Sequence, residues 1–228
     1  MKTKTELVEL LRTDVQAFNA YRQQLMKKEI YDLDLISVDL SYADLRNVNL
    51  RYANLSSVNL RGINGIGADL SCTSLSGANL RNANLSYATL WDADLFNSDL
   101  SGANLSNTNL KSANLEYAKL KDVDLSNTKL RGANLYYANL ENADLNNADL
   151  WDANLSYAKL DQEFIQVVGL GSQKRMTTYL FSDDLIFCGC FKGSLKEFKK
   201  RVKEIYPDEN NKYRLEYLDF IKMINKKR

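Results

Sequence analysis

The chain repeats every five residues from Tyr31 to Leu160, and this period constrains the fold more than any other feature of the sequence. The segment holds 26 consecutive pentapeptides. Counting from Leu35 in steps of five, 25 of the 26 positions are leucine, and Gly65 is the exception. The position two residues earlier is alanine in 16 units, and the position just before the leucine is Asn in 12 and Asp in 9. Such self-similarity is typical of a stack in which each unit contacts only its neighbours.

A period of five predicts a chain that bends at every unit. It matches neither the helical period of 3.6 nor the strand period of two, so the leucines cannot share one side of a straight element. They can all point to a common axis if the chain turns a corner at each pentapeptide, and four units then close a coil of twenty residues. In that all-β solenoid the following leucines stack in one column: Leu35, Leu55, Leu75, Leu95, Leu115, Leu135 and Leu155.

The repeated A-[DN]-L-x-x motif resembles the pentapeptide-repeat family over residues 31–160. The resemblance implies a right-handed, quadrilateral parallel β-helix, which for 26 units corresponds to about 6.5 coils. It implies little about activity, because the functions found in the family are diverse.

The proposed core explains why the inward positions differ in size. Leucine fills the axis, whereas the position two residues earlier lies near a corner and must be small or branched, as at Ala43 and Ser98. Gly65 leaves a hole in this pattern, and Ile63 stands where alanine is usual. We expect Ile63 to fill the space that Gly65 vacates; the alternative is a local bulge that exposes Ile66.

Length and composition favour one elongated body with two end caps over two independent globular domains. We predict three parts, at residues 1–30, 31–160 and 161–228. The chain has no histidine, which removes the commonest general base and metal ligand, and its three cysteines do not suggest a disulfide framework. It shows no signal-peptide pattern and no long apolar run, so we expect a soluble cytoplasmic protein.

Residues 3–28 are predicted to form an amphipathic helix that caps the first coil. Thr3 and Glu6 match a capping box. A dimer seam and a membrane-surface helix are the alternatives; the mixed charge of residues 1–30, with six basic and four acidic side chains, favours the cap. The apolar face comprises Leu7, Leu11, Val15, Phe18 and Leu25.

Residues 161–228 break the period and are predicted to form a small α+β cap on the final coil. A helix should begin after Ser194 and end before Pro207, the only proline. This region resembles a terminal domain attached to pentapeptide repeats and to some phage-associated proteins, which implies no biochemical role. The expected strands are Phe164–Val168, Met176–Phe181 and Leu185–Cys188, and a last helix carries Tyr213, Tyr217, Phe220 and Ile224 as its apolar stripe.

Two local motifs could carry chemistry, but each has a simpler interpretation. Cys188 and Cys190 could bind a metal or act in redox chemistry, yet Cys72 is distant in sequence and alternating cysteines suit a strand. The Gly169–Ser172 segment before two cations could hold an anion, but a hairpin turn fits its spacing better.

The aspartates that precede the leucines alternate with asparagine along the repeat, which indicates turn and ladder hydrogen bonds rather than acid–base catalysis. We therefore predict no catalytic residue, no cofactor and no metal, and a protein that is not an enzyme.

Function is then expected on the outer faces, where side chains twenty residues apart should stack about 4.8 Å apart. Exposed aromatic rows are typical of protein-recognition surfaces, although stacked side chains can also simply join neighbouring coils. We prefer the joining role for the row Asn107, Asn127 and Asn147. The candidate partner-binding residues are Trp91, Lys111, Arg131 and Trp151 in one row, and Tyr117, Tyr137 and Tyr157 in another with Tyr136 beside it.

These features favour a non-catalytic scaffold that presents rigid faces to an unidentified protein partner, as a monomer or weak dimer and without a membrane. The resemblance supplies an alternative, a DNA-mimicking modulator of a type II topoisomerase such as DNA gyrase, as in quinolone-resistance pentapeptide proteins. The repeat has 15 acidic and 10 basic residues, a net charge of −5, whereas duplex DNA of similar length carries on the order of 18 charges. Direct nucleic-acid binding is disfavoured, and the cap's net charge of +4 is its only support.

Overall fold

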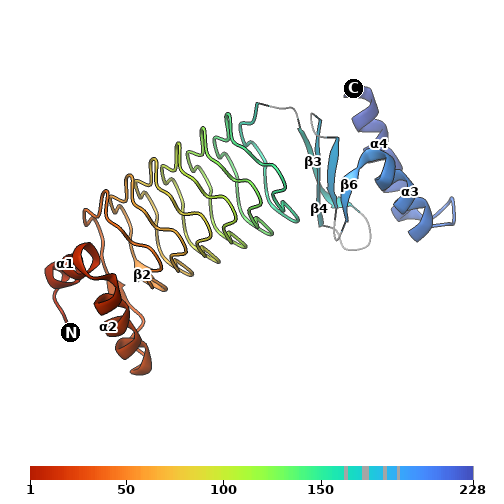
Figure 1. Cartoon of the computed structure of the whole chain (residues 1–228). Helices are drawn as coiled ribbons and strands as arrows, with labels where there is room; N and C mark the ends of the chain where they lie inside the picture. The colour runs from red at the N-terminus through yellow and green to blue at the C-terminus, as the bar shows by residue number, and fades with distance from the viewer. Residues whose placement is uncertain (162–163, 171–174, 182–183, 189–190, 228) are drawn as a thin grey trace. The chain divides into compact units, whose positions relative to one another are not determined.

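The computed structural model describes residues 1–161, 164–170, 175–181, 184–188 and 191–227 (Figure 1). The chain divides into two compact units, which are described separately below. The first comprises Met1–Asp149 with Leu155–Leu160, and the second comprises Leu150–Asn154 with Asp161–Arg228.

The first unit begins with two helices, α1 (Lys4–Thr13) and α2 (Val15–Lys27). The capping box of Thr3 and Glu6 is present at the start of α1, as predicted. The prediction of one continuous helix over residues 3–28 was wrong, because the chain breaks at Asp14. Its backbone is extended (φ −151°), and its side chain accepts a hydrogen bond from the backbone N–H three residues later, which makes it the N-cap of α2.

The repeat forms parallel bridges between positions that are twenty residues apart. The first are between β1 (Leu33–Asp34) and β2 (Ala53–Asn54), and isolated bridges of the same register continue to the pair Asn139 and Lys159. Successive coils lie side by side along the first unit in Figure 1. The predicted twenty-residue coil is therefore confirmed.

The core of the repeat is a column of buried leucines. The central leucines are almost completely buried, and only Leu145 and Leu160 are half-buried. Most residues two positions earlier are buried as well, whereas Val38, Ala143 and Ala158 are half-buried. The hydroxyls of Thr73, Ser98 and Thr108 at this position donate to the carbonyl oxygen three residues earlier, and Thr128 donates to Leu105 O in the preceding coil, so that each of these polar atoms has a partner.

The turns between pentapeptides depend on two outward-facing positions. The Asn or Asp before each leucine accepts the backbone N–H two residues later, as from Ile36 N to Asp34 Oδ1 at 3.0 Å. Such side chains also bond between coils, as from Asn59 Nδ2 to Asp39 Oδ1 at 3.0 Å. These bonds confirm the predicted turn and ladder role of the acidic residues.

The second residue of most pentapeptides adopts a left-handed backbone conformation, which the sequence analysis did not predict. Asn, Asp and Gly are common there and tolerate this conformation. Tyr117 and Tyr137 adopt it too, with φ of 57° and 54°.

The hole at Gly65 is filled by Ile63, as predicted, and also by Leu85 of the next coil, which was not predicted. A Cβ atom placed on Gly65 would lie 3.3 Å from Ile63 Cδ1 and 2.8 Å from Leu85 Cδ2. Ile63 is buried, and the bridges on both sides of Asn64 keep the twenty-residue register. The alternative of a bulge is therefore not observed.

The second unit is a four-stranded antiparallel sheet followed by two helices. Its strands pair in the order β3-β4-β5-β6. The prediction of three strands was incomplete, because the sheet has a fourth strand, β6. Its sequence, FKGS, is short, contains a glycine and ends at Ser194, the N-cap of the next helix, so it did not stand out as a strand. The elements are β3 (Phe164–Leu170), β4 (Arg175–Leu180), β5 (Leu185–Cys188), β6 (Phe191–Ser194), α3 (Leu195–Ile205) and α4 (Lys212–Lys227).

One face of this sheet packs against α3 and α4. The helix α3 begins after Ser194 and ends before Pro207, as predicted, and Ser194 and Glu197 form a capping box at its start. On the sheet, Gln166 Nε2 donates to Ala153 O and to the Thr178 hydroxyl, which ties residues 150–154 to β3 and β4. The buried cluster of this unit comprises Tyr179, Ile186, Cys188, Leu195, Phe198, Val202, Phe220, Ile221 and Ile224.

Candidate interaction surfaces

Three exposed tyrosines form a stacked row, which we name the tyrosine ladder: Tyr117, Tyr137 and Tyr157. The ring centroids of Tyr117 and Tyr137 are 5.3 Å apart with an interplanar angle of 9°, and those of Tyr137 and Tyr157 are 4.9 Å apart at 8°. Their exposed fractions are 44%, 46% and 69%. The predicted row is therefore present, and its side chains are both exposed and mutually packed.

Two further rings flank the ladder at right angles to it. Tyr136 packs edge-to-face against Tyr137 at 4.6 Å, and Phe96 packs edge-to-face against Tyr117 at 5.9 Å. Desolvation raises the pKa of the Tyr136 hydroxyl, and the neighbouring tyrosines add to this effect. Phe96 was not among the predicted surface residues, although its position, forty residues before Tyr136, places it in the same column.

The second predicted row is divided between the two units. Trp91, Lys111 and Arg131 occupy the same position of successive coils in the first unit, and Trp91 is 43% exposed. Arg131 Nε lies 4.0 Å from a carboxylate oxygen of Asp149. Trp151 is half-buried and belongs to the second unit.

The asparagine row is explained by backbone geometry. Asn107, Asn127 and Asn147 all have φ near 58°, in the left-handed region that asparagine tolerates better than most residues. A role in the turns accounts for this row of asparagines, and no protein partner needs to be invoked for it.

The helices α1 and α2 contact the first coil through side chains that bind its backbone. Arg22 is completely buried and donates to the carbonyl oxygens of Ile30, Tyr31 and Arg51. Burial lowers the pKa of the Arg22 guanidinium, and the nearby carboxylate of Asp32 opposes this shift. The sequence analysis did not single out Arg22, because a lone arginine among apolar helix positions gives no signal of burial.

Other polar side chains from the helices continue this pattern along the coil. Arg12 donates to Asp39 O at 2.7 Å. Asn19 donates to Asn47 O at 2.9 Å and accepts from Asn49 N at 2.8 Å. Side chains of the helices thus form hydrogen bonds with backbone groups at this edge of the solenoid. In the interior of the solenoid such groups bond to a neighbouring strand instead.

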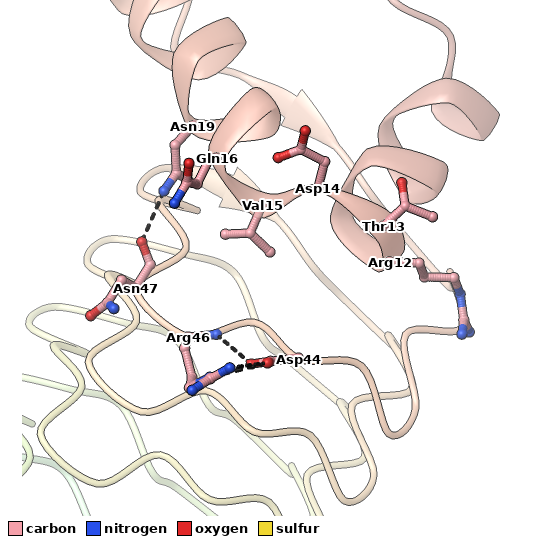
Figure 2. Close-up of a pocket in the computed structure, with 9 residues that line it drawn as sticks. All are labelled: Arg12, Thr13, Asp14, Val15, Gln16, Asn19, Asp44, Arg46 and Asn47. Atoms are coloured by element: carbon pink, nitrogen blue, oxygen red, sulfur yellow. Dashed lines mark hydrogen bonds and ion pairs between the residues drawn. The ribbon is translucent and has the colours of Figure 1, made fainter.

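A polar pocket of about 440 Å³ lies between the α1–α2 junction and the first coil (Figure 2). The Arg46 guanidinium points at Asp44 and forms a bidentate ion pair with it. The Asn19 amide is bonded to the first coil. These groups are already satisfied within the protein, and we assign no ligand to this pocket. Its lining residues are Arg12, Thr13, Asp14, Val15, Gln16, Asn19, Asp44, Arg46 and Asn47.

The described residues contain no group of three His, Cys, Asp or Glu side chains that could hold a metal ion. Cys188 is buried, its Sγ accepts from the Thr177 hydroxyl at 3.2 Å, and burial raises the pKa of its thiol. The predicted hairpin turn at Gly169–Ser172 is described only in its first half, where Gly169 and Leu170 still belong to β3; Gly171, Ser172 and Cys190 lie outside the described residues. Within the described part of the chain, no helix has the length and apolar character needed to cross a membrane.

Comparison with known protein families shows to which family the repeat belongs. The chain matches the family described as Pentapeptide repeats, with 8 copies, over residues 31–64, 66–102, 93–132 and 133–162. The chain belongs to the pentapeptide-repeat family. Its repeat is therefore a right-handed β-helix solenoid, as the resemblance implied.

Solved structures of other pentapeptide-repeat proteins are similar to parts of the chain. HetL from Nostoc sp. strain PCC 7120, involved in heterocyst differentiation regulation, is 30% identical, with 56% of this chain and 84% of that one covered and a TM-score of 0.27. Rfr23 from Cyanothece 51142 is 26% identical, with 64% and 95% covered and a TM-score of 0.27. A trypsin-treated variant of QnrB1, a plasmid-mediated fluoroquinolone resistance protein, is 18% identical, with 57% and 82% covered and a TM-score of 0.35. No match is found among curated protein sequences.

Proposed function

We propose that this protein is a non-catalytic scaffold that binds a protein partner through the tyrosine ladder and the adjoining aromatic side chains. The observation that carries the proposal is the exposure of a packed group of aromatic rings on one face of a rigid solenoid. Aromatic side chains are enriched at the energetic centres of protein interfaces. Pentapeptide-repeat proteins are generally non-enzymatic, which agrees with this role.

The packing of the rings supports binding for a second reason. Each ladder ring is held by its neighbours before any partner arrives, so that less side-chain entropy is lost on association. The row of Trp91, Lys111 and Arg131 is a further candidate contact in the same unit, and Trp151 is a candidate in the second unit.

The proposal includes the finer architecture expected from the sequence. Residues 31–160 would form about 6.5 coils. Residues 1–30 and 161–228 would act as caps that protect the two ends of the solenoid. We also propose a cytoplasmic location. The bonds from Arg12, Asn19 and Arg22 to the first coil support the N-terminal cap.

The distribution of charge supports the scaffold over the topoisomerase alternative. Basic side chains pair with the acidic ones across coils, as Arg81 Nη1 does with Asp99 at 3.2 Å and Arg51 with Asp69 at 3.6 Å. The negative charge is thus interrupted along the repeat, unlike that of a DNA backbone. We therefore do not propose DNA mimicry for this chain.

Replacement of the ladder should weaken partner binding. In the variant Tyr117→Asn, Tyr137→Asn and Tyr157→Asn, the backbone should be retained, because asparagine adopts the same left-handed conformation elsewhere in the repeat. We expect a partner that is captured by the native protein to bind the variant at least about tenfold more weakly, since exposed aromatic anchors are removed. The measurement is quantitative affinity capture followed by a titration with the purified partner.

The matched control is Tyr42→Asn with Tyr87→Asn. Both are exposed tyrosines at the same kind of turn position, outside the ladder, with exposed fractions of 68% and 66%. Equal binding by the native protein and the ladder variant would overturn the proposed surface.

A further inference from the structure

Beside the tyrosine ladder lies a surface group that combines aromatic rings with a carboxylate, which we name the notch: Phe96, Glu116, Tyr117 and Tyr136. Phe96, Glu116 and Tyr136 occupy the same position of three successive coils, joined by the backbone bonds Asn97 N to Glu116 O and Tyr117 N to Tyr136 O, both 2.9 Å. Because coils are spaced about 4.8 Å apart, the backbones of Phe96 and Tyr136 lie about 10 Å apart, with Glu116 between them. The Glu116 side chain thus starts from a position between the two aromatic residues of its column.

A third ring forms the side of this notch. The Tyr117 ring is nearly perpendicular to both flanking rings, with centroids 5.9 Å from Phe96 (80°) and 6.2 Å from Tyr136 (87°). Glu116 therefore shares a column with Phe96 and Tyr136 and precedes Tyr117 in the chain, and Phe96 and Tyr117 are 38% and 44% exposed. The negative face of an exposed aromatic ring attracts a cation.

The carboxylate at the centre has unused hydrogen-bonding capacity. Glu116 Oε2 accepts from Asn134 Nδ2 at 3.1 Å. Among the described residues, no hydrogen-bond donor contacts Oε1, and no lysine or arginine nitrogen lies within 4.0 Å of this carboxylate. The nearby Lys119 is instead directed to Asp99, at 4.0 Å.

We propose that this notch binds an arginine side chain of the protein partner. The inference rests on the proposed function and names the chemistry that the surface recognises. A guanidinium can stack on an aromatic ring while it donates to a carboxylate, whereas a quaternary ammonium would leave Oε1 without a donor. A lysine ammonium can donate but cannot stack as a plane, so arginine fits the group of Phe96, Glu116, Tyr117 and Tyr136 best.

Nucleic acid does not fit this surface. In the tyrosine ladder the ring faces are stacked on one another at 5.3 and 4.9 Å, so few free faces remain for bases to stack on. The carboxylate of Glu116 would in addition repel a phosphate. Charge complementarity thus favours a cationic protein segment.

The test is a titration of the ¹⁵N-labelled full chain with a blocked Gly-Gly-Arg-Gly-Gly peptide, followed by the amide signals of Glu116, Tyr117 and Tyr136. We expect saturable shifts with a dissociation constant in the millimolar range for a single side chain, and binding weakened about tenfold when citrulline replaces arginine. Peptides with lysine or trimethyl-lysine should also bind more weakly.

Two variants test the contributions of the carboxylate and of the rings to binding separately. Glu116→Gln keeps the shape of the side chain, and Phe96→Ser introduces the residue that occupies this position at Ser56 and Ser76. Each should weaken arginine-peptide binding at least about fivefold, whereas Tyr87→Asn should not change it. Absence of saturable shifts, tighter binding of trimethyl-lysine, or unchanged binding by Glu116→Gln would overturn the inference. The proposed function is tested separately. If the arginine peptide fails in one of these ways but the ladder variant still loses partner capture, the inference is wrong and the proposed function stands.

Discussion

Replacing Arg22 with methionine should lower the free energy of unfolding by about 3 kcal/mol or more, because buried carbonyl groups would lose their donors. The native guanidinium is completely buried and donates to three carbonyl oxygens, one on the helix-to-repeat connection, one at the start of the first coil and one in the second coil. Methionine retains the apolar stem but offers no hydrogen-bond donor. Urea unfolding followed by circular dichroism provides the measurement.

Arg46→Met is the matched control. Arg46 forms a bidentate ion pair with Asp44, at 2.6 Å between Nη2 and Oδ2, but both side chains are more than half exposed. Loss of such a surface pair should cost at most about 1 kcal/mol. A loss for Arg22→Met no larger than that for Arg46→Met would show that the buried guanidinium does not hold the helices to the coil.

Removal of residues 1–29 should convert the protein into a self-associating species. The truncated chain would expose the buried side chains of Leu33 and Leu35 and the first-coil backbone groups that the helices bond. An open edge of unpaired backbone groups is a template for pairing with another chain. Size-exclusion chromatography with light scattering should show oligomers or aggregates whose size rises with concentration.

A full-length variant makes the same test without truncation. Phe18 is completely buried on the inner face of α2, so Phe18→Asp should detach the helices and produce the same association. Gln23→Asp, on the exposed side of α2, should leave the oligomeric state of the native protein unchanged. A folded, concentration-independent monomer in both the truncated chain and Phe18→Asp would contradict the role of the helices as an edge-protecting cap.

The repeat could be predicted from the sequence because its pattern and its geometry have the same period. Every leucine position points toward the axis, so the register of the coils and the columns of stacked side chains follow from counting residues. The stacking of Tyr117 on Tyr137 was predicted in this way. Even the exception at Gly65 could be interpreted, because Ile63 supplies the missing volume at the neighbouring inward position.

The remaining features depend on contacts that are distant in sequence or on single turns. The break at Asp14 depends on one side chain that caps α2 in place of continuing the helix. The burial of Arg22 depends on carbonyl groups up to 29 residues away. The notch at Glu116 emerges only when residues from three coils are combined, since no one of its members is unusual by itself.

A cysteine pair across adjacent coils tests the central claim, that twenty residues close one coil. In Asp92→Cys, the new cysteine lies twenty residues from the native Cys72, at the same turn position. The spacing at this turn position is visible at two glycines. A Cβ placed on Gly77 lies 3.6 Å from Ser57 Oγ, and one placed on Gly132 lies 3.8 Å from Ser112 Oγ; each serine is one coil earlier. A separation of about 4.8 Å per coil also suits a disulfide.

Mild oxidation followed by peptide mapping should therefore show an intramolecular Cys72 disulfide in Asp92→Cys. It should show none in Asn82→Cys, half a coil away, or in Ser112→Cys, two coils away. A reduced Cys72 in Asp92→Cys, or equal cross-linking in either control, would contradict the twenty-residue coil.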